Sequence, residues 1–84
     1  MASIYDRVVQ VTARVLKVDE SEIQSQHNFS SDLGAESVQS IELVAMFEEE
    51  FGIDMEEDAA LSVESVGTAA EYIESVCKEQ GVEV

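Results

Sequence analysis

Apolar residues recur at helical spacing along the sequence, and this pattern constrains the fold more than any other feature. In the first stretch Ile4, Val8, Val11 and Val15 follow one another at intervals of three or four residues. Residues on one face of an α-helix recur at this interval. Proline, which would interrupt a helix, is absent from the chain. The sequence therefore predicts an all-α protein.

Polar caps and a glycine mark the ends of the first two long helices. Ser3 and Asp6 have the spacing and chemistry of a capping box, which predicts a helix over about residues 3–17. A second helix is predicted over Ser37–Phe51, and Gly52 is placed to end it in the left-handed conformation. Between these helices lies a long polar connection. It contains three large apolar residues that we expect to anchor it to the core, Ile23, Phe29 and Leu33.

The last third of the chain predicts one short and one longer helix. Residues 57–61 suggest a short helical turn, and Ser65 or Thr68 then begins a helix that Gly81 stops. A chain of 84 residues has room for one modest core. We therefore expect a single domain, residues 1–84.

The charge balance is strongly acidic, with 19 acidic residues against four basic ones and a formal net charge of −15. Such a field repels nucleic acid and anionic membranes and attracts basic protein surfaces. The evenly spaced apolar residues argue against disorder. The lone Cys77 cannot form an internal disulfide and is expected to be a small apolar helix residue. No signal peptide or membrane-spanning run is recognisable, so we expect a cytoplasmic protein without membrane insertion.

Ser37 stands where the second helix begins, three residues after a glycine that permits a turn with positive φ, Gly34. A helix N-terminus has free N–H groups and the positive end of the helix dipole, so it favours an anion such as a phosphodiester on that hydroxyl. The alternative is that Ser37 is only an N-cap, a common role for serine.

Other candidate sites lack essential parts. Asp54, Glu56 and Asp58 alternate like the first ligands of an EF-hand, but the glycine and the closing glutamate of that loop are missing. His27 has no second His or Cys at metal-ligand spacing. A triad of Ser37, His27 and Asp32 would lack the Gly-x-Ser-x-Gly turn. We therefore predict neither a metal site nor a catalytic residue.

The stretch Asp32-Leu33-Gly34-Ala35-Glu36-Ser37-Val38, with the acidic helix Ile41–Phe51 after it, resembles the signature of the acyl carrier protein family. That signature is Asp-Leu-Gly-Ala-Asp-Ser-Leu followed by a helix of the type Val-Glu-Leu-Val-x-x-Leu-Glu-Glu-Glu-Phe. The similarity covers about residues 4–73. Glu36 replaces the usual aspartate and Val38 the usual leucine, which bears on the choice of partner enzymes. Glu36, Gln39 at a position that is often acidic, and Met55 in place of the usual proline suggest a specialised bacterial-type member.

The resemblance implies a four-helix bundle of three longer helices and one short one. It also implies that a phosphopantetheinyl transferase, using coenzyme A, attaches 4′-phosphopantetheine to Ser37. The arm would end in a thiol that carries acyl groups as thioesters for fatty-acid, lipid or polyketide biosynthesis. The protein itself would be a monomer and not an enzyme. Its other partners would be acyl-transferring, condensing or acyl-activating enzymes.

An acidic docking face and an acyl pocket are expected on the same grounds. The second helix also carries glutamates whose charge opposes the helix dipole, and the sequence shows no group within the chain that would offset this cost. A basic partner is therefore indicated for Glu42, Glu48, Glu49 and Glu50. The expected docking residues are Glu36, Val38, Ile41, Glu42, Ala45, Glu48, Glu49, Glu56 and Glu57. The expected pocket residues are Phe29, Leu43, Phe47, Leu61, Val66, Ala69 and Ile73.

Two alternatives remain open from the sequence. A peptidyl carrier would use the same serine and arm for aminoacyl cargo, but such domains tend to have a Gly-Gly-x-Ser motif and less acidity. A helical interaction module without a prosthetic group would use the acidic helix only as a docking face.

Overall fold

A computed structural model describes residues 3–82. Within this range the chain forms α1 (Ile4–Leu16), a 3₁₀ helix (Glu20–Glu22), α2 (Ser37–Phe51), α3 (Glu57–Leu61) and α4 (Val66–Glu79). The predicted all-α, four-helix architecture is confirmed, and the short helix has the predicted bounds. The single domain predicted for residues 1–84 includes two residues at each end that lie outside the described range.

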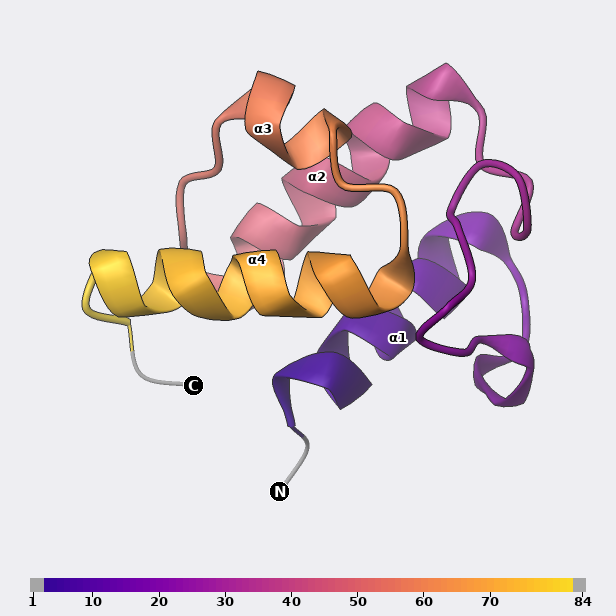
Figure 1. Cartoon of the computed structure of the whole chain (residues 1–84), viewed down its shortest axis with the longest axis horizontal. Coiled ribbons are helices and arrows are strands. Elements are labelled where there is room, and N and C mark those ends of the chain that lie inside the picture. The colour runs from indigo at the N-terminus through magenta and orange to yellow at the C-terminus, as the bar shows by residue number, and fades with distance from the viewer. Residues whose placement is uncertain (1–2, 83–84) are drawn as a thin grey trace.

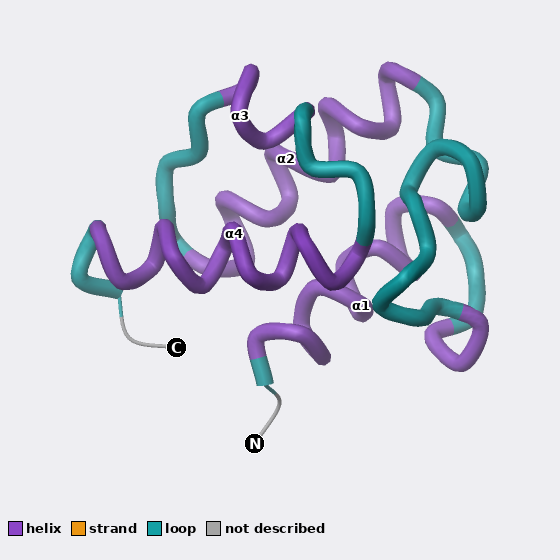
Figure 2. The backbone as a smooth tube through the Cα atoms, in the orientation of Figure 1, coloured by secondary structure: helices purple, strands orange, loops and turns teal. Residues whose placement is uncertain are grey.

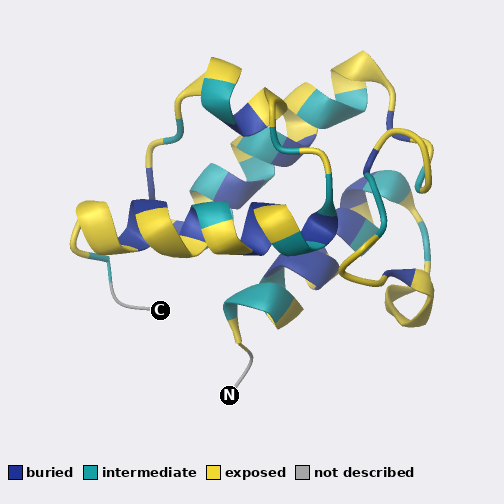
Figure 3. Cartoon of the chain, in the orientation of Figure 1, coloured by how far each residue is buried: buried dark blue, intermediate teal, exposed yellow. Residues whose placement is uncertain are grey.

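Helix α1 packs against both α2 and α4, and α3 packs on α2. Figure 1 shows α4 crossing in front of α1, with α2 and α3 above it. The long loop between α1 and α2 lies at one end of this arrangement (Figure 2). Buried side chains line the inner sides of the helices (Figure 3). The least exposed apolar ones are Val8, Val11, Val66, Ile73 and Cys77.

The helix ends follow the local signals in the sequence. The Ser3 Oγ accepts a 3.1 Å hydrogen bond from the Asp6 N–H, and the Ser3 N–H donates to the Asp6 carboxylate, which confirms the capping box. Gly52 ends α2 with φ of 65°. Helix α4 begins after Ser65, whose Oγ accepts from the N–H of Thr68, so Ser65 is the cap and Thr68 is not.

The long loop is fixed by backbone contacts with the start of α4. The N–H groups of Val66 and Gly67 each donate a 2.9 Å hydrogen bond, to the carbonyl oxygens of His27 and Ser25 respectively. A Cβ on Gly67 would lie 3.1 Å from the Ser25 oxygen, so glycine permits this close approach. The loop therefore caps α4 by supplying acceptors for its first N–H groups.

Apolar side chains hold the same loop against the core. Ile23 and Phe29 are buried as predicted, whereas Leu33 is only half-buried. Ala35, which was not predicted as an anchor, is also buried. The His27 Nδ1 accepts a hydrogen bond from the N–H of Gln24, so this ring stabilises the loop.

A single arginine ties α1 to the end of α2. The Arg7 Nε lies 2.8 Å from the Glu50 Oε2, and the Arg7 Nη2 donates a 2.7 Å hydrogen bond to the Glu50 carbonyl oxygen. Its guanidinium carbon lies 4.4 Å from the centroid of the Phe51 ring. The prediction that the α2 glutamates have no stabilising partner within the chain is therefore wrong for Glu50. The positive charge of Arg7 offsets both the Glu50 carboxylate and the negative end of the α2 dipole.

Candidate functional site

The segment before α2 is a hydrogen-bonded turn. The Asp32 Oδ2 accepts a 2.7 Å hydrogen bond from the Asn28 N–H, and the Ala35 N–H donates a 2.8 Å bond to the Phe29 carbonyl oxygen. Gly34 has φ of 75°, as predicted, which is a backbone conformation that favours glycine. With Ala35 buried, the turn fixes the direction in which the chain enters α2.

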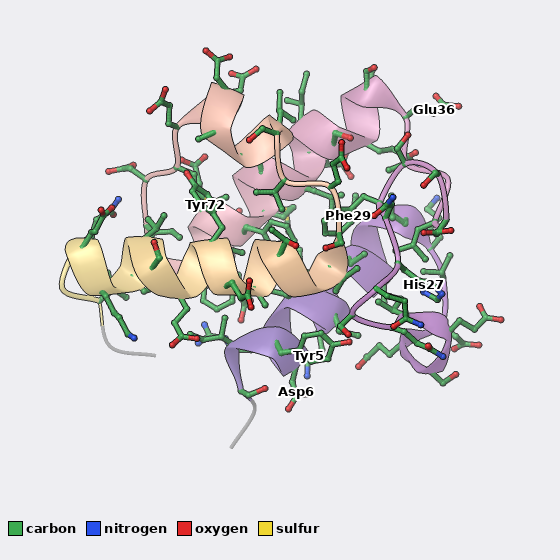
Figure 4. The ribbon with its side chains drawn as sticks, viewed as in Figure 1. Tyr5, Asp6, His27, Phe29, Glu36 and Tyr72 are labelled. Atoms are coloured by element: carbon green, nitrogen blue, oxygen red, sulfur yellow. The ribbon has the colours of Figure 1, made fainter. Side chains whose placement is uncertain are left out.

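Ser37 is the first residue of α2, and the preceding residue caps the helix. Glu36 has the extended backbone of an N-cap, with φ of −88° and ψ of 170°, and its N–H donates a 3.0 Å hydrogen bond to the Gln39 Oε1. The alternative role considered for Ser37, that of an N-cap, is therefore wrong. Figure 4 shows Glu36 directed away from the bundle at this end of α2.

The chemistry at this position fits a phosphodiester on the serine. Ser37 is exposed, and its hydroxyl is not needed to cap the helix that it begins. The helix N-terminus offers N–H groups and a positive partial charge to an anion attached there. Ser37 and its chain neighbours Glu36 and Val38 are all exposed, so a transferase can approach the hydroxyl.

Residues 6–73 match the family model described as the phosphopantetheine attachment site. The chain belongs to this family. The predicted likeness to acyl carrier proteins is thereby confirmed, and the chain is a carrier protein to which 4′-phosphopantetheine is attached covalently. Carrier domains of this family interact with a phosphopantetheinyl transferase and with biosynthetic enzymes, and are not themselves catalytic.

A cavity of about 380 Å³ lies between α2, α3 and α4 of this carrier. Six of the seven predicted pocket residues line it: Phe29, Leu43, Phe47, Leu61, Ala69 and Ile73. Val66 does not, because it begins α4 beneath the long loop, where its side chain is wholly buried in the core. Ser40 and Val44, spaced like Leu43 and Phe47 along α2, also line the cavity; helical periodicity could have identified both.

The rest of the cavity wall was not predicted. It includes Met55 from the link between α2 and α3, Val63 after α3, and Tyr72 of α4. Figure 4 shows Tyr72 extending from α4 toward the side of α2 and α3. Polar residues line one part of the wall: Asn28, Ser30, Ser31, Ser40 and Glu64. These come from segments far apart in the sequence, so no local pattern joins them.

One face of α2 presents most of the predicted docking residues to solvent. Ser37, Ile41 and Ala45 are four residues apart and all exposed, which places them on the same side of the helix. Val38 and Ile41 are 73% and 51% exposed, unusually high values for large apolar side chains. The remaining exposed members of the predicted set are Glu36, Glu42, Glu49, Glu56 and Glu57.

Glu48 differs from the other predicted docking residues. It is half-buried, and its Oε2 accepts a 2.9 Å hydrogen bond from the N–H of Met55. Like Glu50, it therefore has an internal partner that the sequence did not reveal.

The other candidate groups do not assemble into sites within residues 3–82. No three His, Cys, Asp or Glu side chains of this range lie together in a way that could hold a metal ion. His27 and Asp32 each accept a hydrogen bond from loop backbone and do not form a triad with Ser37. Cys77 is buried, and this burial raises the pKa of its thiol. None of the described helices is long and apolar enough to cross a membrane.

Proposed function

We propose that Ser37 is the attachment residue and that the chain is an acyl carrier protein for fatty-acid, lipid or polyketide biosynthesis. In the attachment step the Ser37 Oγ bonds to the phosphopantetheine phosphorus of coenzyme A. The pyrophosphate bond breaks, adenosine 3′,5′-bisphosphate leaves, and the hydroxyl proton passes to a base of the transferase. The exposed hydroxyl at the start of α2, outside the capping hydrogen bonds, supports this assignment. The bound group supplies a thiol that carries cargo as a thioester.

The cavity is the observation that favours acyl cargo. Its apolar wall, formed by side chains such as Leu43, Phe47 and Ile73, suits a hydrocarbon chain. The cavity volume of about 380 Å³ gives such a chain room to bury methylene groups. Burial of each methylene contributes about 0.8 kcal/mol. The alternative, a peptidyl carrier, would leave this apolar volume without a clear use.

The exposed face of α2 is proposed to dock the transferase and the acyl-transferring, condensing or acyl-activating enzymes. Exposed carboxylates such as Glu42 and Glu49 would attract Lys and Arg patches, while Val38 and Ile41 supply apolar contact. Charges of this kind raise association rates more than affinity, which suits a carrier that must be released after each step. The net charge of −15 opposes self-association and supports a monomer. The buried single thiol of Cys77 is compatible with a cytoplasmic location.

Intact mass spectrometry tests the proposed function. The wild-type chain, incubated with a phosphopantetheinyl transferase and coenzyme A, should gain one phosphopantetheine. Ser37→Ala should gain none, whereas the matched control Ser40→Ala, one turn along the same helix, should be modified like the wild type. A modified Ser37→Ala chain would refute the assignment. Loading of the modified carrier with fatty-acyl and aminoacyl donors then separates the acyl from the peptidyl carrier.

A further inference from the structure

The link between α2 and α3, residues 52–56, is tied to the end of α4 by one side chain. The Gln80 Oε1 accepts a 3.0 Å hydrogen bond from the Asp54 N–H, and the Gln80 Nε2 donates a 2.7 Å bond to the Asp54 carbonyl oxygen. Both polar atoms of one amide therefore pair with the backbone of a single residue. Asp54, which lies outside the helices, has both its backbone groups bonded to a residue 26 positions away.

The backbone of Gln80 is itself well fixed. Gln80 is the C-cap of α4, and its N–H donates a 3.0 Å hydrogen bond to the Val76 carbonyl oxygen. Two residues later the Val82 N–H donates a 2.9 Å bond to the Cys77 carbonyl oxygen, which holds the end of the helix on the other side of Gln80. The anchor thus belongs to α4, and the link is the part that the Gln80 amide restrains.

The neighbours of Asp54 connect this restraint to the core and to the cavity. Ile53 is buried in the core, and Met55 lines the cavity. The Met55 N–H also donates a 2.9 Å hydrogen bond to Glu48 of α2. The link then continues into α3, which lines the cavity too. A shift of Asp54 would therefore move Met55 and change the cavity wall.

Met55 forms the cavity wall at the end far from Ser37. Its bonding partner Glu48 follows Ser37 by 11 residues, which corresponds to about 16 Å along α2. At the near end the wall is polar, with Asn28 from the long loop and Ser40 from the first turn of α2. Figure 1 shows the link rising to α3 beside the C-terminal half of α4, on the opposite side of the bundle from the start of α2. A chain tethered at Ser37 and inserted past the polar end therefore points toward Met55.

We propose that Gln80 is a positioning residue that sets the length of the cargo. By bonding to Asp54 it holds the Met55 wall in place, so a chain long enough to reach this wall is accommodated only if both hydrogen bonds break. Shorter chains meet no such cost. The limit is a property of the isolated carrier and needs no partner enzyme. This inference deepens the proposed acyl-carrier function and rests on it, because it specifies the size of the cargo.

Amide hydrogen exchange on the unmodified full chain, followed by NMR, tests the restraint without cargo. Gln80→Met keeps the length of the side chain but removes both hydrogen bonds, so the Asp54 N–H should exchange about tenfold faster. The matched control Gln10→Met makes the same replacement at an exposed position of α1 and should leave Asp54 unchanged. Exchange at the core residue Ile73 reports any global loss of stability. An unchanged Asp54 exchange rate in Gln80→Met would overturn the proposal.

A series of saturated acyl chains tests the length limit itself. A transferase that accepts acyl-coenzyme A loads the wild type and Gln80→Met with chains of increasing length, and urea unfolding gives the stability of each product. In the wild type, added carbons should stabilise the carrier until the chain reaches Met55, and further carbons should add nothing. In Gln80→Met this plateau should begin about two or three carbons later, since the link can then move by about one residue length, about 3.5 Å. Gln10→Met should keep the wild-type plateau.

Gly67→Ala is a second control, because it crowds the start of α4 and leaves the link intact. If Gly67→Ala moved the plateau as Gln80→Met does, general destabilisation would explain the shift and the proposal would fail. The same plateau in the wild type and Gln80→Met would also overturn it. A failure of the proposed function would look different: Ser37 would accept no arm, or no acyl chain of any length would stabilise the wild type.

Discussion

Replacement of Arg7 by alanine should destabilise the protein far more than replacement of any other arginine. Its hydrogen bond to the Glu50 carbonyl oxygen, from a charged donor, corresponds to about 1.5 kcal/mol. The ion pair with Glu50 adds at most about 1 kcal/mol, because both side chains are partly exposed, at 25% and 32%. The contact with the Phe51 ring adds about 0.5 kcal/mol. These contacts share one side chain and are not independent, so we expect a loss of about 2 kcal/mol.

Arg14 provides the matched control on the same helix. It is exposed, lies in the last turn of α1, and has the same charge, so Arg14→Ala reports the general effect of making the chain more acidic. Urea unfolding followed by circular dichroism should give Arg7→Ala a free energy of unfolding about 2 kcal/mol below the wild type. The free energy of unfolding of Arg14→Ala should fall by well under half as much as that of Arg7→Ala. Equal losses in the two variants would refute the reasoning, because long-range charge would then account for the whole effect.

Three further predictions follow from the surface, the loop and the core. Glu42→Lys with Glu49→Lys should slow modification by the transferase about tenfold, and raised salt should slow the wild type, because both weaken steering of a basic partner. Gly67→Ala should lower the free energy of unfolding by about 1 kcal/mol in a urea titration, since the added Cβ crowds the long loop. As the pH rises above 9, the free energy of unfolding should fall more steeply for the wild type than for Cys77→Ala, because burial raises the pKa of the Cys77 thiol.

Controls separate each of these effects from general ones. Glu71→Lys with Glu79→Lys makes the same change of charge on exposed positions of α4 and should not slow modification; a similar slowing would contradict docking on α2. A stabilised Gly67→Ala would mean that the loop moves aside at no cost. For Cys77, the folded pKa is raised, so its contribution is complete below the unfolded pKa and is lost as pH rises through the folded value. Parallel pH profiles of the wild type and Cys77→Ala would contradict this account.

Most of the fold could be predicted because its signals are local. Ser3 with Asp6, and the glycines at 34 and 52, act on residues within a few positions, so the sequence indicates both the turns and the helix ends. The exposed side of α2 was harder to predict, because apolar residues occur on both sides of that helix. Val38 and Ile41 look like core residues from their spacing alone, and only the family resemblance placed them in the expected docking face; the packing of α1 and α3 against the other side leaves them exposed.

The parts that could not be predicted depend on contacts between distant segments. The partner of Glu50 is 43 positions away in α1, and the partner of Gln80 is 26 positions away in the α2–α3 link. Val66 lies on the same face of α4 as Ala69 and Ile73, yet the long loop covers the end of the helix and separates it from the cavity. Periodicity gives the face of a helix but not what covers each turn of it.

The most direct test of the central claim is to locate the modification within the chain. The wild-type protein, treated with transferase and coenzyme A, is digested and the modified peptide is sequenced by tandem mass spectrometry. The account predicts a single phosphopantetheine on Ser37, with Ser40 in the same helix unmodified. Phosphopantetheine on any other residue, or an unmodified Ser37 in the presence of an active transferase, would contradict it.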